Sequence, residues 1–389
     1  MPDQPLPLQE PSDQPDQPLL DVRDLRVSFR TRTGPATAVD GLSLSVAPGE
    51  ILGVVGESGS GKSVSMLAVL RLLTSPNVTV TGQVLFRGRD LLALTDKEMR
   101  AVRGREIAMV FQDPMTALTP VYTVGWQIAE QIRAHEPVSR KEAHARAVTL
   151  LSDVGIPDAA SRVKAYPHEF SGGMRQRAVI AMALACRPAL LIADEPTTAL
   201  DVTIQAQILD LMRDLNARGS AVVLITHDMG VVSEIAHRVL VMYGGRVAEQ
   251  GPRRAVFHSP RHPYTWGLLD SVPRVGGPRL RRLPTIAGTP VSPDSLPDGC
   301  AFAPRCRLRH EGCEERPELA ASPDDAAHHD ACRLPAGDRA ALRLGARAPA
   351  DETATAGEPD PSGEADQSGE TDPSGETDPV DEADREMAP

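Results

Sequence analysis

One short stretch of the sequence has the residue types and spacing of a phosphate-binding loop. It reads GESGSGKS and stands between the apolar run ILGVV and the helical pattern VSMLAVLRLL. Small residues leave backbone N–H groups free to surround an anion, and a helix that starts at the end of the loop adds a favourable dipole. In such loops the lysine contacts the β- and γ-phosphates and the last hydroxyl binds Mg²⁺. The sequence therefore predicts that a nucleoside triphosphate contacts Gly56, Glu57, Ser58, Gly59, Ser60, Gly61, Lys62, Ser63 and Val64.

Three later apolar runs each stop at polar side chains. Continuous apolar runs of this length predict parallel strands that are buried on both faces. The runs and the polar residues after them are Ile107–Phe111 with Gln112, Ala189–Ala193 with Asp194 and Glu195, and Ala221–Thr226 with His227. The carboxyl ends of parallel strands form the ligand-binding edge of an open sheet. We therefore expect these side chains to lie beside the phosphate loop.

Phosphoryl transfer needs positioned charge and an oriented nucleophile, and these polar residues offer both. Asp194 is the expected carboxylate ligand of Mg²⁺, and Glu195 is the expected general base for the attacking water. Gln112 would contact the metal or that water, and His227 would hold the γ-phosphate. Without the phosphate loop, the carboxylate pair would fit a helix start equally well, and a lone histidine is more often structural.

The segment between Gln112 and Phe170 has the periodicity of amphipathic helices. Apolar residues recur at helical spacing at Ala147, Leu150, Leu151 and Val154. The segment ends at FSGGMRQR, where Ser171 is a candidate N-cap and Gly172 and Gly173 leave a second set of helix-start N–H groups. Taken alone, this stretch could be a cap and no more. If it is a second anion site, its ligand is unexplained, because one nucleotide needs only one phosphate-binding helix start.

These motifs, in this order, resemble those of the nucleotide-binding subunits of ABC transporters, over most of residues 20–335. The matching segments are the phosphate loop, the Q-loop residue Gln112, the signature SGGMR, the Walker B run LLIADE, the D-loop TALD and the switch His227. The resemblance implies that two such chains pair head to tail. The residues that would then face the partner's ATP are Ser171, Gly172, Gly173, Met174 and Asp201. Phe29 falls where the family stacks an aromatic ring on adenine, although it could equally be a core residue of an early strand.

The resemblance also implies a fold and a division of the chain. The fold is the α/β P-loop NTPase of ABC ATPases, with a parallel core sheet, an antiparallel β subdomain and a helical insertion. We expect a disordered extension over 1–19, the ATPase domain over 20–258 with its insertion at about 113–170, and a cysteine-containing C-terminal region over 259–335. An acidic disordered tail would follow over 336–389. In the family, the helical insertion receives a short helix of a membrane-spanning subunit.

Charge and hydropathy limit the other classes of function. Residues 351–389 hold fourteen acidic residues and one arginine, so the rest of the chain is nearly neutral although the whole chain carries −12. A nearly neutral body offers no basic face for nucleic acid. The longest apolar stretch, AVIAMALAC, is half the length that spans a bilayer. The first twenty residues lack the pattern of a signal peptide, so we expect a protein that reaches the membrane through a partner on its cytoplasmic face.

Four of the five cysteines lie close to the C-terminal end: Cys300, Cys306, Cys313 and Cys332. Disulfides are improbable in a reducing cytosol, and such crowding favours a metal or a cluster. Four thiolates suit either Zn²⁺ or a [4Fe–4S] cluster, and the spacing alone does not decide. Similar peptide importer ATPases hold an iron–sulfur cluster here, which favours that group over zinc and over free thiols.

Two further segments narrow the resemblance to the ATPases of dipeptide and oligopeptide importers, a group that includes nickel importers. These are RHPYTWGLLDSVPR from Arg261 and LPDGCAFAPRC from Leu296. The implied protein is an ATPase subunit paired with a related second ATPase or with itself, two permease subunits and an extracytoplasmic binding protein. The chief alternative is an ABC ATPase of DNA repair or translation, although no sustained heptads separate the loop from the signature. A third possibility is that the cysteines sense redox state and gate the ATPase.

Overall fold

The computed structural model describes residues 17–113, 117–198, 201–272 and 285–347. Its strands form two sheets. The strands are β1 Leu20–Thr31, β2 Gly34–Val46, β3 Ile51–Val55, β4 Val78–Phe86, β5 Arg89–Asp90, β6 Ile107–Val110, β7 Leu190–Asp194, β8 Ala221–Thr226, β9 Arg238–Tyr243, β10 Arg246–Pro252, β11 Ala320–Ser322 and β12 Asp325–Asp330. The predicted buried strands are confirmed to within one residue at each end.

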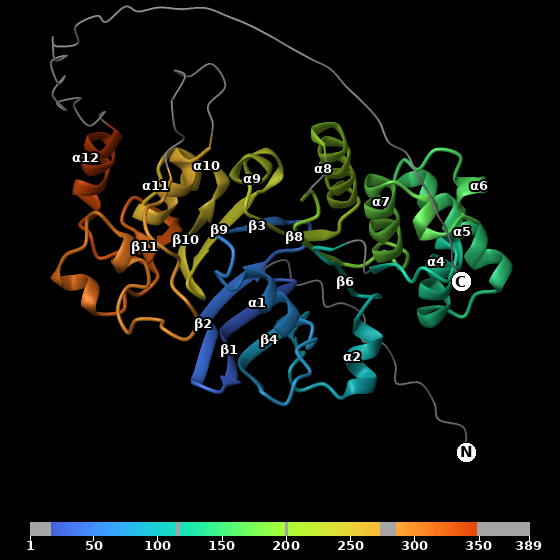
Figure 1. Cartoon of the computed structure of the whole chain (residues 1–389), viewed down its shortest axis with the longest axis horizontal. Helices are drawn as coiled ribbons and strands as arrows, with labels where there is room; N and C mark the ends of the chain where they lie inside the picture. The colour runs from blue at the N-terminus through green and yellow to red at the C-terminus, as the bar shows by residue number, and fades with distance from the viewer. Residues whose placement is uncertain (1–16, 114–116, 199–200, 273–284, 348–389) are drawn as a thin grey trace, which may run out of the picture. The chain divides into compact units, whose positions relative to one another are not determined.

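Helices follow most strands and fill the segment between β6 and β7 (Figure 1). The α-helices are α1 Lys62–Val69, α2 Asp96–Val102, α4 Val124–His135, α5 Arg140–Asp153, α6 Ala159–Arg162, α7 Gly172–Ala183, α8 Val202–Ala217, α9 Met229–Ile235, α10 Arg253–His258, α11 Pro263–Asp270 and α12 Ala336–Arg347. The described ranges also hold three short 3₁₀ helices, η1 Pro167–Glu169, η2 Ala303–Arg305 and η3 Glu311–Glu314.

The larger sheet has the order β11-β12-β10-β9-β3-β8-β7-β6. Its five strands from β9 to β6 are parallel, and β10, β12 and β11 continue it in antiparallel fashion. The smaller sheet is antiparallel, with the order β2-β1-β4-β5. This is the predicted α/β fold, with a parallel core and a separate antiparallel sheet.

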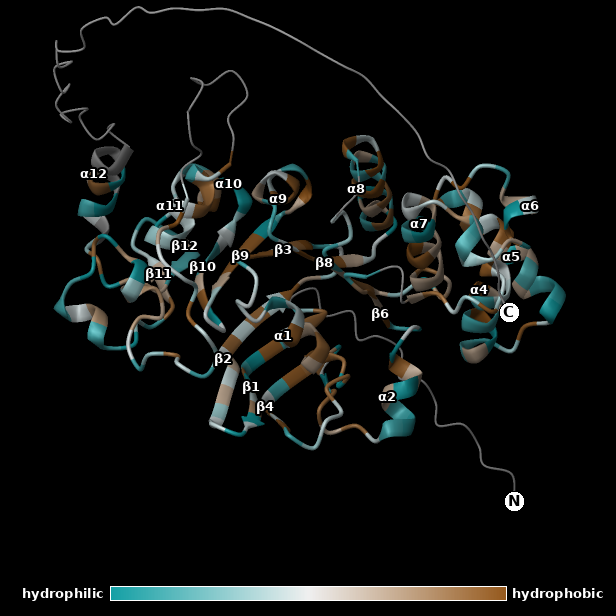
Figure 2. Ribbon diagram, viewed as in Figure 1, coloured by the Kyte–Doolittle hydropathy of each residue, from teal (hydrophilic) through white to brown (hydrophobic). Residues whose placement is uncertain are grey.

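Both faces of the parallel strands are covered, which explains why their sequences are apolar without alternation. In β8, Val222 and Leu224 belong to the core shared with α7, α8 and the helical segment. Their neighbours Val223 and Ile225 belong to the core shared with α1 and the antiparallel sheet. Figure 2 shows these central strands largely in the brown of hydrophobic residues.

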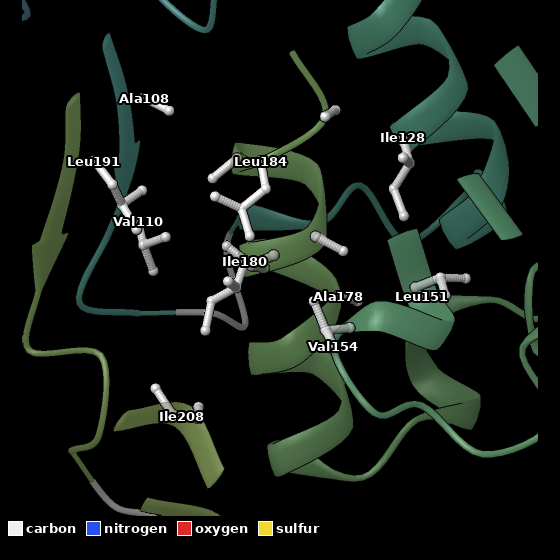
Figure 3. Packing of buried hydrophobic residues seen from close by; sticks show 14 of the residues in the cluster. Ala108, Val110, Ile128, Leu151, Val154, Ala178, Ile180, Leu184, Leu191 and Ile208 are labelled. Atoms are coloured by element: carbon white, nitrogen blue, oxygen red, sulfur yellow. The ribbon is translucent and has the colours of Figure 1, made fainter. Parts of the chain in front are cut away.

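Helix α7 connects the parallel sheet to the helical segment between β6 and β7. Ile180 and Leu184 face the strands that carry Val110 and Leu191, as Figure 3 shows. On the other side of α7, Ala178 lies beside residues of α4 and α5, including Leu151. Ser171 caps α7 as predicted, since its hydroxyl accepts a hydrogen bond from the Met174 N–H. The helix that begins at Ser171 is thus fixed by packing on both sides.

The C-terminal region joins the larger sheet through β12, which pairs with β10. The region also shares an apolar core with β9 and α9, in which Tyr264 of α11 and Phe302 are grouped with Val241 and Val232. The predicted disordered tail starts at residue 336, whereas the structure forms α12 over Ala336–Arg347. This difference has a local cause: Arg339 is buried and donates to Asp330 and to the carbonyl groups of Cys332 and Leu334. Residues 1–16 of the predicted extension over 1–19, and residues 348–389 of the predicted tail, lie outside the described residues.

Candidate functional site

The phosphate loop connects β3 to α1, as the sequence predicts. Gly56 and Gly61 both have positive φ, and a Cβ atom at either position would collide with a backbone carbonyl, of Met242 and of Ala38 respectively. Gly61 is the N-cap of α1, so the backbone N–H groups at the start of α1 face the loop. Only glycine fits both places, which leaves the loop backbone close to its ligand and free of side chains.

Lys62 is buried at the first position of α1. Its Nζ donates to the carbonyl groups of Gly56 at 2.7 Å and Glu57 at 2.9 Å. Burial lowers the pKa of Lys62, although the carboxylates of Glu195, Asp194 and Glu57 oppose this shift. A buried ammonium group without a bound counter-ion is unfavourable, and a phosphate oxygen would supply one.

The next loop residue, Ser63, contacts the end of β7. Its hydroxyl donates to Asp194 Oδ1 at 2.9 Å. Burial raises the pKa of Asp194, and the hydrogen bond from Ser63 opposes this shift. A hydroxyl and a buried carboxylate next to a phosphate loop form the donor set that Mg²⁺ prefers. The residues present therefore fit this ion.

Glu195 brings the remaining predicted polar residues together. Gln112 Nε2 donates to one carboxylate oxygen at 3.0 Å, and His227 Nδ1 lies 3.2 Å from the other. Burial disfavours the charged form of Glu195, but hydrogen bonds from His227 and Thr198 outweigh it and keep the pKa of this carboxyl below its ordinary value. Its φ of 48° is unusual for a residue other than glycine. This ionised carboxylate is thus held in one orientation at the end of a buried strand.

Three strands therefore deliver their polar ends to one place, as the sequence predicts. One member of the group was not predicted from the sequence: Thr198, whose hydroxyl donates to Glu195 Oε2 at 3.0 Å. Its position as the first residue of the TALD motif was the available signal.

The other predicted contacts do not lie within this group. Ser171, Gly172, Gly173 and Met174 start α7, and Asp201 caps α8 by accepting from the Ile204 N–H. None of the hydrogen bonds described for this single chain joins these residues to the phosphate loop. Phe29 lies in β1, where it packs against the core with Val64 of α1 and Val78 of β4. Its ring is therefore at least partly a core side chain.

The four C-terminal cysteines line one cavity together with His262, Phe302 and Leu334. Burial raises the pKa of the Cys300 and Cys306 thiols, and raises that of Cys332 to about 11. Among the described residues, no group of three or more Cys, His, Asp or Glu side chains is gathered as one metal ion requires. The structure thus brings the cysteines to a common cavity, and it does not give them the spacing of a zinc site.

An exposed aromatic patch lies at the start of the helical segment. The rings of Tyr122 and Trp126 stack with their centroids 4.1 Å apart, and each residue is nearly half exposed. Val121 beside them is 70% exposed, and Phe111 after β6 is 43% exposed. Exposed apolar groups of this size mark a contact surface for another molecule. Within the described ranges, no helix combines the length and the hydropathy that a bilayer span requires.

Comparisons with known proteins agree with this geometry. A family model described as "ABC transporter" matches residues 39–198, and one described as "Oligopeptide/dipeptide transporter, C-terminal region" matches residues 248–313. A putative peptide import ATP-binding protein of Brucella melitensis is 54% identical over 309 residues, which cover 76% of this chain and 91% of the relative. The dipeptide transport ATP-binding protein DppD of Escherichia coli is 50% identical over 303 residues, covering 77% of this chain and 92% of the relative.

Solved structures show the same likeness over the ATPase part. The dimeric post-hydrolysis structure of the ATP-binding cassette MJ0796 with ADP and Pi matches with a TM-score of 0.55 and 27% identity. The match covers 60% of this chain and 99% of that one. The structure of cbiO1 from Clostridium perfringens, described as part of an ABC transporter complex, matches with a TM-score of 0.54 and 26% identity, over 63% of this chain and 92% of that one.

Proposed function

Because the chain belongs to the ATP-binding subunits of ABC transporters, in their oligopeptide and dipeptide branch, we propose that it drives import of small peptides by hydrolysing ATP. The observation that carries the proposal is the group around Glu195, where side chains from three strand ends meet beside the phosphate loop. The C-terminal match and the names of the relatives support peptides as cargo. Nickel is the alternative cargo.

The roles of the site residues follow from their contacts. Backbone N–H groups of the loop and Lys62 would hold the β- and γ-phosphates, while Ser63 and Asp194 would hold Mg²⁺. When bound, Mg²⁺ neutralises charge on the phosphates. Glu195 would accept the proton of the attacking water, and His227, which lies beside the Glu195 carboxylate, would orient it and contact the γ-phosphate. Gln112 would contact the water or the metal.

A second chain would complete the site. Ser171, Gly172, Gly173 and Met174 form the start of α7, and none of the described hydrogen bonds joins them to this chain's own phosphate loop; their helix-start N–H groups would bind the partner's nucleotide. Asp201 would lie at the same interface. We propose that the partner is a related ATPase subunit, with a second copy of this chain as the alternative. ATP-dependent dimerisation of the Glu195→Gln variant, alone or with the companion ATPase, tests this by size-exclusion chromatography.

The exposed aromatic patch around Tyr122 and Trp126 would receive a short helix of a permease subunit. Large aromatic side chains that are half exposed suit an apolar helix, and they lie at the start of α4 in the helical segment. This contact would hold the chain at the cytoplasmic face of the membrane. An extracytoplasmic binding protein would then deliver the cargo to the permease.

The four cysteines would hold a [4Fe–4S] cluster. Such a cluster binds each thiolate to a different iron, so its ligands surround a cavity and need not converge on one point. The cavity lined by all four cysteines fits that need better than it fits a single zinc ion. Protein purified without oxygen should contain iron and sulfide and absorb visible light. If oxidation abolishes both this absorption and the ATPase activity, the cluster gates the ATPase by its redox state. A colourless, iron-free preparation with full activity would contradict both ideas.

The central experiment is purification from native membranes followed by transport. The tagged chain should capture two hydrophobic permease subunits. Membrane vesicles that hold the complex with this chain on their inner face should accumulate labelled dipeptides only when ATP is enclosed inside them. The same complex with Glu195→Gln should bind ATP without uptake. Capture of ribosomal or DNA-repair proteins instead would contradict the importer, and uptake of nickel but not peptides would change the cargo.

A further inference from the structure

The second residue of the phosphate loop is held by the C-terminal region. The Glu57 carboxylate accepts two hydrogen bonds from Arg305, Nη1 to Oε2 at 2.5 Å and Nη2 to Oε1 at 3.0 Å. The Glu57 N–H donates to the Tyr264 hydroxyl at 2.8 Å. Arg305 and Tyr264 follow Glu57 by 248 and 207 residues in the sequence. The phosphate loop of the ATPase domain is therefore held by hydrogen bonds from residues of the C-terminal region.

Arg305 is itself rigidly fixed. Its side chain is 3% exposed, and it also donates to the carbonyl groups of Ala287 and Ile286 and to the Tyr243 hydroxyl. Its guanidinium lies over the Tyr243 ring. A bidentate pair with every donor occupied is a strong and directional contact. Arg305 thus sets where the Glu57 carboxylate lies.

The contact between Arg305 and Glu57 also changes the charge beside the phosphate loop. The Glu57 carbonyl accepts from Lys62 Nζ, so the Glu57 residue touches the lysine that would contact the phosphates. Without Arg305, a carboxylate would stand unpaired at the mouth of the loop and repel a triphosphate. With Arg305, that charge is neutralised and the cradle remains attractive to anions.

We propose that Arg305 is a positioning residue for ATP, which neutralises and orients Glu57 so that the C-terminal region sets the ATP affinity of the phosphate loop. Tyr264 is the second fastening point, at the backbone of the same residue. The proposal rests on ATP binding by the loop and is independent of the cargo.

Binding of a fluorescent ATP analogue to the full chain tests the proposal. Arg305→Gln should raise the dissociation constant about tenfold, which corresponds to about 1.4 kcal/mol. In a charge-repulsion mechanism, Glu57→Gln in the Arg305→Gln background should recover most of that loss, because it removes the unpaired carboxylate. The ATP KM should rise in parallel while kcat changes less than twofold. Arg307→Gln is the matched control, since Arg307 is exposed two residues away and forms none of the described hydrogen bonds.

Two results would overturn the proposal. One is unchanged ATP affinity in a folded Arg305→Gln variant whose melting temperature alone falls. The other is a double variant that binds ATP no better than Arg305→Gln. If Arg305→Gln fails to fold, Tyr264→Phe decides, because it removes only the hydroxyl that accepts from the Glu57 N–H. A threefold or larger loss of affinity is expected there, and wild-type affinity would refute the proposal. Failure of peptide uptake would leave these measurements unaffected.

Discussion

The polar side chains of the strand-end site are partly exposed to solvent, whereas those at the junction with the C-terminal region are buried. Around the phosphate loop, His227 is 59% exposed and Glu195 keeps 14% of its side chain exposed. Where the C-terminal region meets β10, Glu249 is fully buried and accepts from the backbone N–H groups of Arg261 and His262 while it contacts His328. The first set keeps access to a ligand, and the second is satisfied within the protein. We therefore expect substitutions around Glu195 to change chemistry and substitutions around Glu249 to change stability.

The largest expected effect is on turnover, at Glu195. Glu195→Gln removes the proton acceptor while keeping the shape, so the ATPase rate should fall about 10²–10⁴-fold. ATP affinity and melting temperature should stay near wild type. Steady-state phosphate release and equilibrium ATP binding measure this, with Glu234→Gln on the exposed face of α9 as control. Normal turnover would remove Glu195 from the role of base.

The next largest effect is on stability, at the buried pair of Glu249 and His328. Their side chains are 0% and 3% exposed and lie 2.7 Å apart. His328→Ala leaves a buried carboxylate without its side-chain partner, so the free energy of unfolding should fall by about 3 kcal/mol. Urea unfolding measures the loss, and His144→Ala on the exposed face of α5 is the control. A stable variant with a slower ATPase would reverse the comparison between the two regions.

A smaller effect is expected on nucleotide binding, at Lys62. Lys62→Ala removes a charge-assisted contact to the phosphates, which corresponds to about 10- to 100-fold weaker ATP binding. Relief of a buried charge should leave stability unchanged or higher. Binding of a fluorescent ATP analogue checks the affinity, and Lys97→Ala, exposed on α2, is the control. Unchanged affinity would contradict the phosphate assignment.

The last prediction is an effect that is nearly absent at neutral pH and concerns His262, which caps α11 by accepting from the Tyr264 N–H. Burial lowers the pKa of His262 to about 3, and the charge of Arg339 adds to the shift. Below pH 6.5 this histidine is protonated in the unfolded chain but stays neutral in the folded chain. Acid therefore lowers the free energy of unfolding by up to about 1.4 kcal/mol per pH unit, down to about pH 3. His262→Asn keeps a capping group without this titration, and its melting temperature should fall less between pH 7 and pH 5. Parallel curves for both proteins would contradict this.

The sequence predicts the strand-end site well because each motif there is local. GESGSGKS specifies its own turn through glycines, and each polar residue follows directly on a buried strand. The pairing of Glu57 with Arg305 carries no such signal, because the two residues meet only after the C-terminal region has folded against the ATPase core. The same holds for α12, which the buried Arg339 anchors to Asp330. The acidic composition of residues 351–389 led to the prediction of a disordered tail that already included α12.

The order of the larger sheet has a consequence for association between copies of the chain. Its two margins are β11 with three residues and β6 with four. Short outer strands offer few unpaired backbone groups to another sheet, which limits edge-to-edge polymerisation. Removal of the hairpin formed by β11 and β12 would uncover the edge of β10 that now pairs with β12 at Glu249 and Gln250. A chain shortened before Ala320 should therefore precipitate at concentrations where the full chain stays dispersed.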